Sequence, residues 1–174
     1  NSLLVSLGRI VGSIEKKFAE LQRKREGALI PFVTAGDPNL ATTLKILHAL
    51  EKGGADCIEL GIPFSDPTAD GPTIQRSSER ALRNGVSLPR IFQVVRDFRR
   101  TSEVPIVLFG YFNPIFHYGL ENFCRAAARA GADGVLCVDL PPEESAELKR
   151  WTDAKELDLI FLLSPTSGPD RVRL

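Results

Sequence analysis

Short apolar segments recur along this sequence at a nearly constant spacing, with a helix-forming segment between each pair. Phe32 and Glu59, which lie in two successive apolar segments, are 27 positions apart, and Phe109 and Val138 are 29 positions apart. The interval from Glu59 to Phe109 is 50 positions, which leaves room for one extra helix. Strands that alternate with helices pair in parallel through right-handed crossovers. The sequence therefore predicts an α/β fold built from repeated strand–helix units.

Apolar runs and three- or four-residue periodicity give the expected bounds of these elements. An amphipathic helix comes first, with Leu7, Ile10, Ile14, Phe18 and Leu21 on one face. The expected strands are 28–34, 57–60, 105–109, 134–138 and 157–163. Two of the expected later helices start at Pro38 and near Leu120. Three others are expected to cover 72–84, 87–100 and 142–153. Residues 111–115 are expected to form a loop.

Two architectures fit this rhythm, a (β/α)8 TIM barrel and a doubly wound open sheet. The first strand–helix turn, VTAGDP, lacks the G-x-G-x-x-G sequence typical of dinucleotide-binding open sheets. A repeat, GADCIEL at 54–60 and GADGVLCVDL at 131–140, indicates that equivalent units are reused, so we favour the barrel. A complete barrel has eight strands in about 250 residues. Residues 1–174 are therefore expected to be one barrel domain that covers about the first five units, with strands six to eight absent.

Composition argues against several classes of function. Lys plus Arg and Asp plus Glu each number 22, so the chain has no charge excess that would attract nucleic acid or an anionic membrane. The longest apolar runs are far shorter than the roughly 18 residues that indicate a membrane span, and the amino-terminal segment does not resemble a secretion signal. Three cysteines without CxxC spacing indicate buried thiols. We expect a cytoplasmic protein without a metal site.

The stretch IELGIPFSDPTADGPTIQ, residues 58–75, places carboxylates directly after a buried strand. Side chains alternate along a strand, so with Ile58 and Leu60 packed toward the helices, Glu59 faces the barrel interior. A carboxylate between apolar walls loses hydration, its pKa rises, and it becomes a general acid and base near neutral pH. The alternative is a structural glutamate tied to a backbone amide or a lysine. The expected apolar walls are Phe32, Phe109 and Leu136.

The other acidic residues near strand ends have ordinary structural explanations. Asp70 directly precedes an expected helix, where aspartate usually caps the amino terminus. Asp66 in FSDP is typical of an Asx-turn. Asp37 and Asp139 follow strands and are expected to cap or brace. Spacing alone supports one catalytic acid, Glu59, and leaves its partner unassigned.

Several segments together closely resemble one enzyme family, the tryptophan synthase alpha chain. They are PFVTAGDP, IELGIPFSDPTADGPTIQ, YFNPI, GLENF and VDLPPEE, and the resemblance runs from about Phe18 to the end. It implies a TIM barrel lyase of tryptophan biosynthesis that cleaves indole-3-glycerol phosphate to indole and glyceraldehyde 3-phosphate by a retro-aldol reaction, without metal or organic cofactor. By position in the motif, Glu59 corresponds to the general acid/base and Asp70 to the acid that holds the indole N–H. The residues that correspond to the indole pocket are Phe32, Phe109, Tyr111 and Leu136.

The resemblance also implies a partner, a beta chain that uses pyridoxal phosphate, in an alpha2beta2 heterotetramer. The loop positions that match the contact region, each of which is also compatible with an ordinary turn, are Pro63, Asp66, Asn113 and Pro141. In this family the substrate phosphate is held by later barrel strands, so a polypeptide ending at Leu174 is expected to have open edges and little or no lyase activity. Two alternatives stay open: a regulatory subunit that activates its partner, and another phosphosugar barrel enzyme. None of the expected strands supplies the inward lysine at its end that a Schiff-base aldolase needs.

Overall fold

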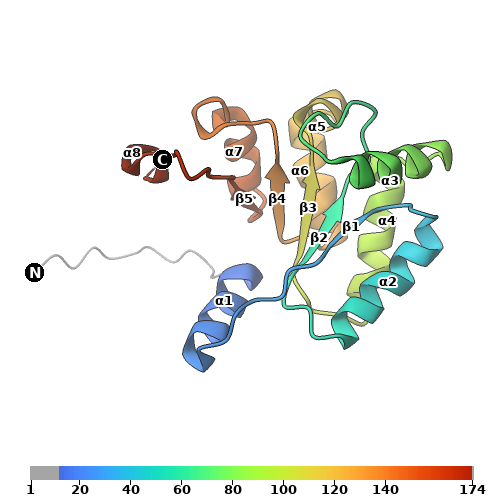
Figure 1. The fold of residues 1–174 in the computed structure, drawn as a ribbon, viewed down its shortest axis with the longest axis horizontal. Helices are drawn as coiled ribbons and strands as arrows, with labels where there is room; N and C mark the ends of the chain where they lie inside the picture. The colour runs from blue at the N-terminus through green and yellow to red at the C-terminus, as the bar shows by residue number, and fades with distance from the viewer. Residues whose placement is uncertain (1–11, 174) are drawn as a thin grey trace, which may run out of the picture.

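The computed structural model describes residues 12–173 and shows a five-stranded parallel sheet with helices packed against its outer face (Figure 1). The order of the strands in space follows their order in the chain, β1-β2-β3-β4-β5. A doubly wound open sheet reverses its strand order at a switch point, and the five described strands contain no reversal. They are arranged as five consecutive strands of a (β/α)8 barrel, which confirms the predicted fold class.

Prolines determine where two of the strands begin. Pro31 and Pro105 have no N–H to donate to a neighbouring strand, so each contributes only its carbonyl. The Pro31 carbonyl accepts from the Glu59 N–H at 2.9 Å, and the Pro105 carbonyl accepts from the Ile58 N–H at 2.8 Å. The first strand is therefore shorter than the predicted 28–34. The last is also shorter than the predicted 157–163, since Leu162 and its neighbour are exposed. The strands are β1 (Phe32–Thr34), β2 (Ile58–Gly61), β3 (Ile106–Gly110), β4 (Gly134–Cys137) and β5 (Asp158–Ile160).

The helices follow the predicted pattern with two corrections. Residues 111–115 are not a loop, because α5 begins at Phe112, whose N–H donates to the Asp139 carboxylate at 2.7 Å. The predicted helix 142–153 is divided at Ser145, whose hydroxyl donates to the Pro142 carbonyl at 2.8 Å. The helices are α1 (Ser13–Lys24), α2 (Leu40–Lys52), α3 (Pro72–Arg83), α4 (Leu88–Arg99), α5 (Phe112–Tyr118), α6 (Leu120–Ala130), the 3-10 helix η1 (Pro142–Glu144), α7 (Ala146–Asp153) and α8 (Pro169–Val172).

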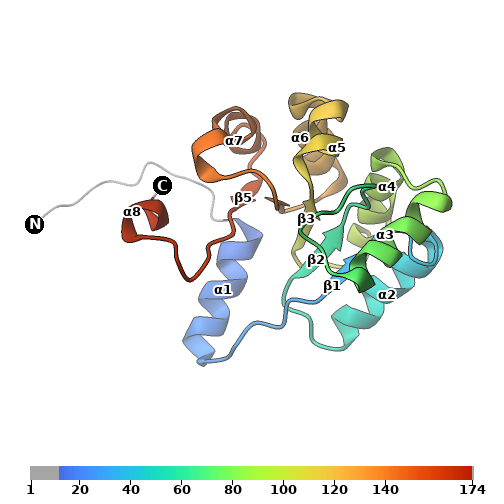
Figure 2. The same ribbon diagram turned by 45° about the horizontal axis from the view of Figure 1, so that its top comes forward.

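The first helix crosses the end of the sheet at which the strands begin (Figures 1 and 2). Ile14 of α1 packs against the side chains that fill the inner face of the sheet, and Leu21 is buried. The predicted role of this helix, to cover one end of the core, is confirmed for its described part. Leu7 and Ile10, which the periodicity also placed on this helix, lie outside the described residues.

Strand side chains alternate between two apolar cores. Outward-facing residues such as Ile58 and Leu60 are fully buried beneath the helices. Cys57 belongs instead to the inner cluster with Val107 and Leu136, against which Ile14, Phe109, Val138 and Ile160 pack. Side chains alternate between the two faces along a strand, and Glu59 lies two residues after Cys57, which directly precedes β2. The Glu59 side chain therefore belongs to the inner face, as predicted.

An ion-paired network closes the end of the sheet opposite the strand carboxyl termini. The Asp133 carboxylate accepts hydrogen bonds from the Ser13 hydroxyl, the Arg99 guanidinium and the Ile106 N–H, the last at 2.7 Å. Arg99 also donates to the Gly131 carbonyl at 2.7 Å. Both charged side chains are less than one-fifth exposed, at 19% and 18%. These contacts join α1, α4, β3 and the turn before β4, so this end of the molecule is built for stability.

Candidate active site

Glu59 occupies the inner face of β2, between Phe32 on β1 and Val107 on β3. Burial raises the pKa of its carboxyl group, and no charge or hydrogen bond of the described residues opposes that shift. The predicted raised pKa is confirmed. The alternative, a glutamate tied to a lysine or a backbone amide, is wrong for residues 12–173, because none of them pairs with this carboxylate.

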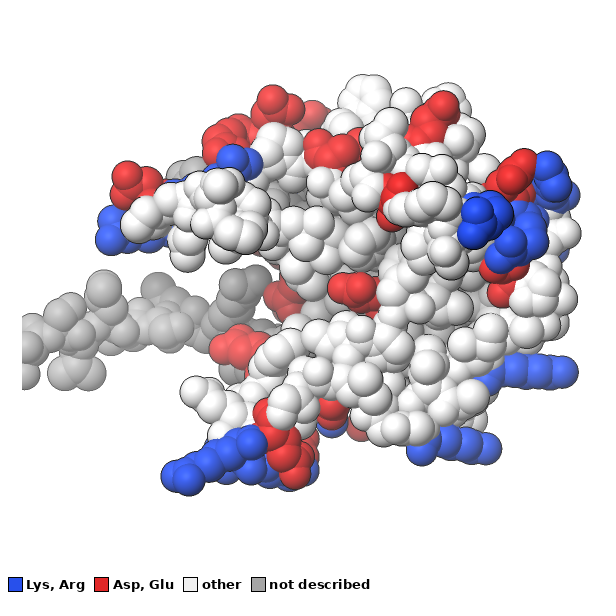
Figure 3. Space-filling view, viewed as in Figure 1, with Lys and Arg blue, Asp and Glu red and all other residues white. Residues whose placement is uncertain are grey.

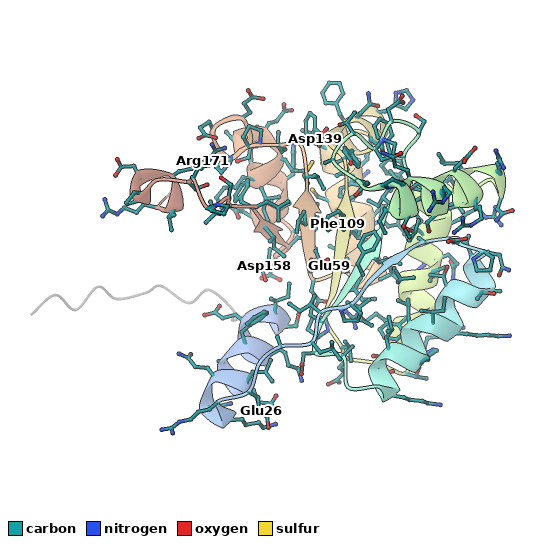
Figure 4. The ribbon with its side chains drawn as sticks, viewed as in Figure 1. Glu26, Glu59, Phe109, Asp139, Asp158 and Arg171 are labelled. Atoms are coloured by element: carbon teal, nitrogen blue, oxygen red, sulfur yellow. The ribbon has the colours of Figure 1, made fainter. Side chains whose placement is uncertain are left out.

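An aromatic pair lies beside Glu59: Phe32 is level with it on β1, and Phe109 on β3 is level with Gly61, closer to the carboxyl ends of the strands. The rings of Phe32 and Phe109 meet edge to face with their centroids 5.2 Å apart, and Leu136 is the register neighbour of Phe109. Phe109 packs against the inner cluster, and Figure 4 shows Glu59 and Phe109 near each other in the middle of the sheet. Figure 3 shows acidic groups, in red, in the middle of the molecule in the same view. The structure thus brings Phe32, Phe109 and Leu136 to one apolar wall, as predicted.

Two residues of this wall were missed by the sequence analysis. A Cβ atom at Gly61 would lie 2.5 Å from the Phe32 ring, so the ring occupies the space that a side chain at position 61 would need. Thr34, at the end of β1, is buried, and its hydroxyl has no hydrogen-bond partner among the described residues. The signals were a glycine inside a strand, which often marks a close approach, and a polar residue at a strand end.

Asp70 reaches the site from the loop between β2 and α3. Its Oδ2 accepts a hydrogen bond from the Tyr111 hydroxyl at 3.1 Å, and the same hydroxyl oxygen accepts from the Ala69 N–H at 3.0 Å. The N-cap interpretation of Asp70 is wrong: the N-cap residue of α3 is Gly71, with no side-chain cap bond. The tyrosine hydroxyl instead draws the aspartate side chain toward β3.

Tyr111 is buried at 4% exposure and packs against Phe64, with ring centroids 5.3 Å apart. Burial is the main cause that raises the pKa of its hydroxyl, and the charge of Asp70 acts in the same direction. The phenol therefore remains a proton donor at neutral pH. Its place is consistent with a pocket wall, and its hydroxyl also holds the loop that carries Asp70.

The remaining acidic residues act within the scaffold. Asp37 accepts two hydrogen bonds from Arg80, at 2.8 and 2.6 Å, and this arginine is the main reason that the pKa of Asp37 is lowered. Asp139 accepts the N–H of Phe112 at the start of α5. Both braces were predicted. The Asx-turn at Asp66 is wrong, because the Thr68 N–H donates to the backbone carbonyl of Asp66 at 2.9 Å and not to its side chain. The Asp66 carboxylate accepts instead from the neighbouring Ser65 hydroxyl at 2.5 Å.

The four residues matched to a partner contact differ in exposure. Asp66 and Asn113 are exposed and Pro141 is half-buried. Pro63 is buried and lines a separate apolar hollow of about 240 Å³ beneath the β2–α3 loop. All four lie on loops or helix starts that follow β2, β3 or β4, so they share the end of the sheet that carries the candidate site.

Neither a metal centre nor a membrane span is evident in residues 12–173. The described part of the chain contains no group of three His, Cys, Asp or Glu side chains arranged to hold a metal ion. Burial raises the pKa of all three cysteine thiols, Cys57 and Cys124 to about 11 and Cys137 to about 12, so these thiols are protonated and inert at neutral pH. None of the described helices has the length and apolar character needed to cross a membrane.

A model of the family described as tryptophan synthase alpha chain matches residues 18–174. This chain belongs to the tryptophan synthase alpha chain family. The tryptophan synthase alpha chain of Geobacter sp. (strain M21) is 60% identical over 161 residues, which are 92% of this chain and 60% of that relative. The crystal structure of tryptophan synthase subunit alpha from Legionella pneumophila str. Paris matches with a TM-score of 0.91 and 45% identity, over 93% of this chain and 62% of that one.

A further match is a chain from a structure of the tryptophan synthase a2b2 complex of Pyrococcus furiosus. It has a TM-score of 0.80 and 46% identity, over 84% of this chain and 59% of that chain. This chain therefore spans about 60% of the length of the curated tryptophan synthase alpha chains that it matches. The barrel topology described above is that of the tryptophan synthase alpha chain family.

Proposed function

We propose that this chain carries the acid–base centre of a cytoplasmic lyase that cleaves indole-3-glycerol phosphate to indole and glyceraldehyde 3-phosphate in tryptophan biosynthesis. The observation that carries the proposal is the state of Glu59, a desolvated carboxyl group with a raised pKa on the inner face of a barrel strand. Family membership supplies the reaction, and Glu59 supplies the proton transfers that it needs.

Cleavage of the carbon–carbon bond requires indole C3 to leave with the bonding electrons. Glu59, when protonated, adds a proton to C3 and gives an indolenine, whose ring nitrogen becomes an electron sink. A base then removes the proton of the glycerol hydroxyl, the carbon–carbon bond breaks, its electrons enter the ring, and the hydroxyl carbon becomes the aldehyde of glyceraldehyde 3-phosphate. After its first transfer Glu59 is a carboxylate and can act as that base. Positioned proton transfer of this kind is worth about 10² to 10⁴ in rate.

Asp70 is proposed to accept the indole N–H and to stabilise the positive charge that develops on the ring nitrogen. The Tyr111 hydroxyl holds one carboxylate oxygen, Oδ2, at 3.1 Å. That contact leaves Oδ1 for the substrate and fixes the direction in which it points. A carboxylate fixed in place before the charge develops stabilises the transition state more than a mobile one.

The apolar wall suits a flat aromatic ring. Phe32, Phe109 and Leu136 share the inner face near Glu59, and Tyr111 flanks Asp70. The chemistry above consists of proton transfers alone, so we propose that it needs no metal or organic cofactor. No lysine occurs in any of the five described strands, which gives no support to an aldolase of the Schiff-base type.

We further propose that the chain assembles with a beta chain in an alpha2beta2 complex, with pyridoxal phosphate bound only to that partner. The structure matched in Pyrococcus furiosus is described as a tryptophan synthase a2b2 complex, which supports an assembly of this kind. The proposed contact residues are Pro63, Asp66, Asn113 and Pro141.

The test replaces Glu59 with Gln in the purified protein mixed with beta chain, with indole release from indole-3-glycerol phosphate as the readout. We expect a loss of at least about 100-fold in kcat. Glu26→Gln is the matched control, because Glu26 is exposed and lies far from Glu59 in Figure 4. If E59Q and E26Q release indole at the same rate, Glu59 is not the acid–base group and a purely regulatory subunit becomes the better reading.

A further inference from the structure

Three arginines surround a hollow on the outer surface of the helix layer, between α4 and α6. These two helices pack side by side. The hollow has a volume of about 380 Å³, and Arg96, Arg125 and Arg129 line it together with Tyr118, Asn122 and Ala126. No acidic residue is among its lining residues. The chain has equal numbers of acidic and basic residues, so a hollow lined by three cations and no anion departs from its average surface. We call it the arginine groove.

Neutral groups orient two of the guanidinium groups without cancelling their charge. Arg96 donates from Nη2 to Gln93 Oε1 at 2.7 Å, and Arg125 donates from Nη2 to Asn122 Oδ1. Amide oxygens fix the direction of a guanidinium and leave its full positive charge available to a ligand. Arg129 forms no ion pair with any of residues 12–173.

The acidic residues nearest in sequence do little to neutralise the arginine groove. Glu121 lies 3.7 Å from Arg125, and both side chains are about half exposed, a geometry in which an ion pair contributes little. Asp97 on α4 forms an ion pair with Arg100 at 3.3 Å and accepts a hydrogen bond from Gln93 at 3.1 Å, so its charge is already engaged. The cationic character of the arginine groove is therefore retained.

We propose that the arginine groove binds a small anion that carries one or two phosphate groups. Guanidinium groups match phosphate oxygens in paired hydrogen bonds, and three of them on two helices call for a ligand with several acceptor oxygens rather than a single carboxylate. The Tyr118 hydroxyl and the Asn122 amide add neutral donors. The arginine groove lies on the helix side of the sheet, whereas Glu59 lies on the inner face. Binding here is thus separate from the proposed lyase site and does not depend on it.

The experiment titrates inorganic pyrophosphate, and separately inorganic phosphate, into the ¹⁵N-labelled purified protein at constant ionic strength and follows the backbone amide resonances. We expect saturable shifts at α4 and α6 with a Kd of about 1 mM or lower. Arg96→Gln and Arg129→Gln should each weaken binding about five- to tenfold. Arg23→Gln is the control, because it removes an exposed arginine of α1 far from the arginine groove.

Weaker binding by these variants reports the loss of a ligand contact and not unfolding, because the substituted arginines are exposed and their loss leaves the fold intact. Tighter binding of pyrophosphate than of phosphate assigns a ligand with two phosphate groups, and equal binding assigns one with a single group. The proposal is overturned if neither anion gives saturable shifts, if R23Q weakens binding as much as R96Q does, or if the shifts centre on the strand residues around Phe109 instead of on α4 and α6.

Discussion

Replacing Tyr111 with Phe removes one oxygen atom and tests whether the hydroxyl positions Asp70. The oxygen takes part in two hydrogen bonds, to Asp70 at 3.1 Å and from the Ala69 N–H at 3.0 Å. The ring is buried against Phe64 and stays in place, so the substitution opens no large cavity. The change therefore isolates the hydrogen bonds from the packing.

The magnitude follows from the geometry of these bonds. Hydrogen bonds to charged groups contribute about 1.5 to 3 kcal/mol, and the 3.1 Å contact to Asp70 is long for a bond to a carboxylate, so the lower limit applies. Ala69 is exposed, and water can replace the lost partner of its N–H. We expect a loss of about 1 to 1.5 kcal/mol in the free energy of unfolding. If the same interaction holds Asp70 in the transition state, kcat falls about tenfold.

Two assays on one preparation measure these effects, urea unfolding followed by circular dichroism and steady-state indole release in the presence of beta chain. Tyr118→Phe is the matched control, since no described residue forms a hydrogen bond with the Tyr118 hydroxyl. The positioning role of Tyr111 is refuted if Y111F keeps the kcat of the parent protein, or if Y118F lowers kcat to the same extent. A fall in stability without a fall in kcat assigns the hydroxyl to loop packing alone.

Three further predictions concern stability. The pKa of Glu59 is raised in the folded state, so the free energy of unfolding falls as the pH rises above 4.5, the ordinary pKa of a glutamate. Glu59→Gln should therefore raise the urea midpoint at pH 7 but not at pH 4. An unchanged midpoint at pH 7 would contradict the argument that burial raises this pKa. Arg99→Ala leaves the Asp133 carboxylate without its cation and should lower the free energy of unfolding in urea by about 3 kcal/mol. Arg100→Ala, at a side chain that is 76% exposed, should lower it by less than about 0.5 kcal/mol. Equal losses would refute the stabilising role of the Asp133 network. The pKa of Asp37 is lowered, so the stabilisation that its carboxylate gives is present above pH 3.8 and is lost as the pH falls further. Asp37→Asn should therefore make the temperature of unfolding less sensitive to acid. An unchanged dependence of that temperature on pH would contradict this prediction.

Much of the fold was predictable because the strands are buried on both faces and the helices carry regular apolar stripes. The orientation of Glu59 followed from one alternation, with Ile58 and Leu60 outward. Element bounds were less accurate where a contact distant in sequence decides them. The helix that begins at Phe112 depends on an acceptor 27 positions away, the Asp139 carboxylate, and no local pattern contains that information.

The site was predictable in its position and less so in its contacts. Residue order identified the acidic loop after β2, but the partner of Asp70 is a tyrosine 41 positions later, directly after the neighbouring strand β3. Local preference pointed to an N-cap at Asp70, and the tertiary hydrogen bond overrode it. The role of Gly61 was likewise hidden, because it depends on the direction of the Phe32 ring.

If the chain carries the proposed lyase site, the missing side chain at position 61 offers a means of changing its substrate preference. A methyl group there would fall within 2.5 Å of the Phe32 ring and force it to turn, while the β2 backbone that carries Glu59 could keep its place in the sheet. Ring tilt, and with it the room available to bulkier or smaller indoles, can thus be altered from a position that contributes no atoms to proton transfer. Libraries that vary residues 61 and 32 together would explore substituted indoles while leaving the reactive carboxyl group untouched.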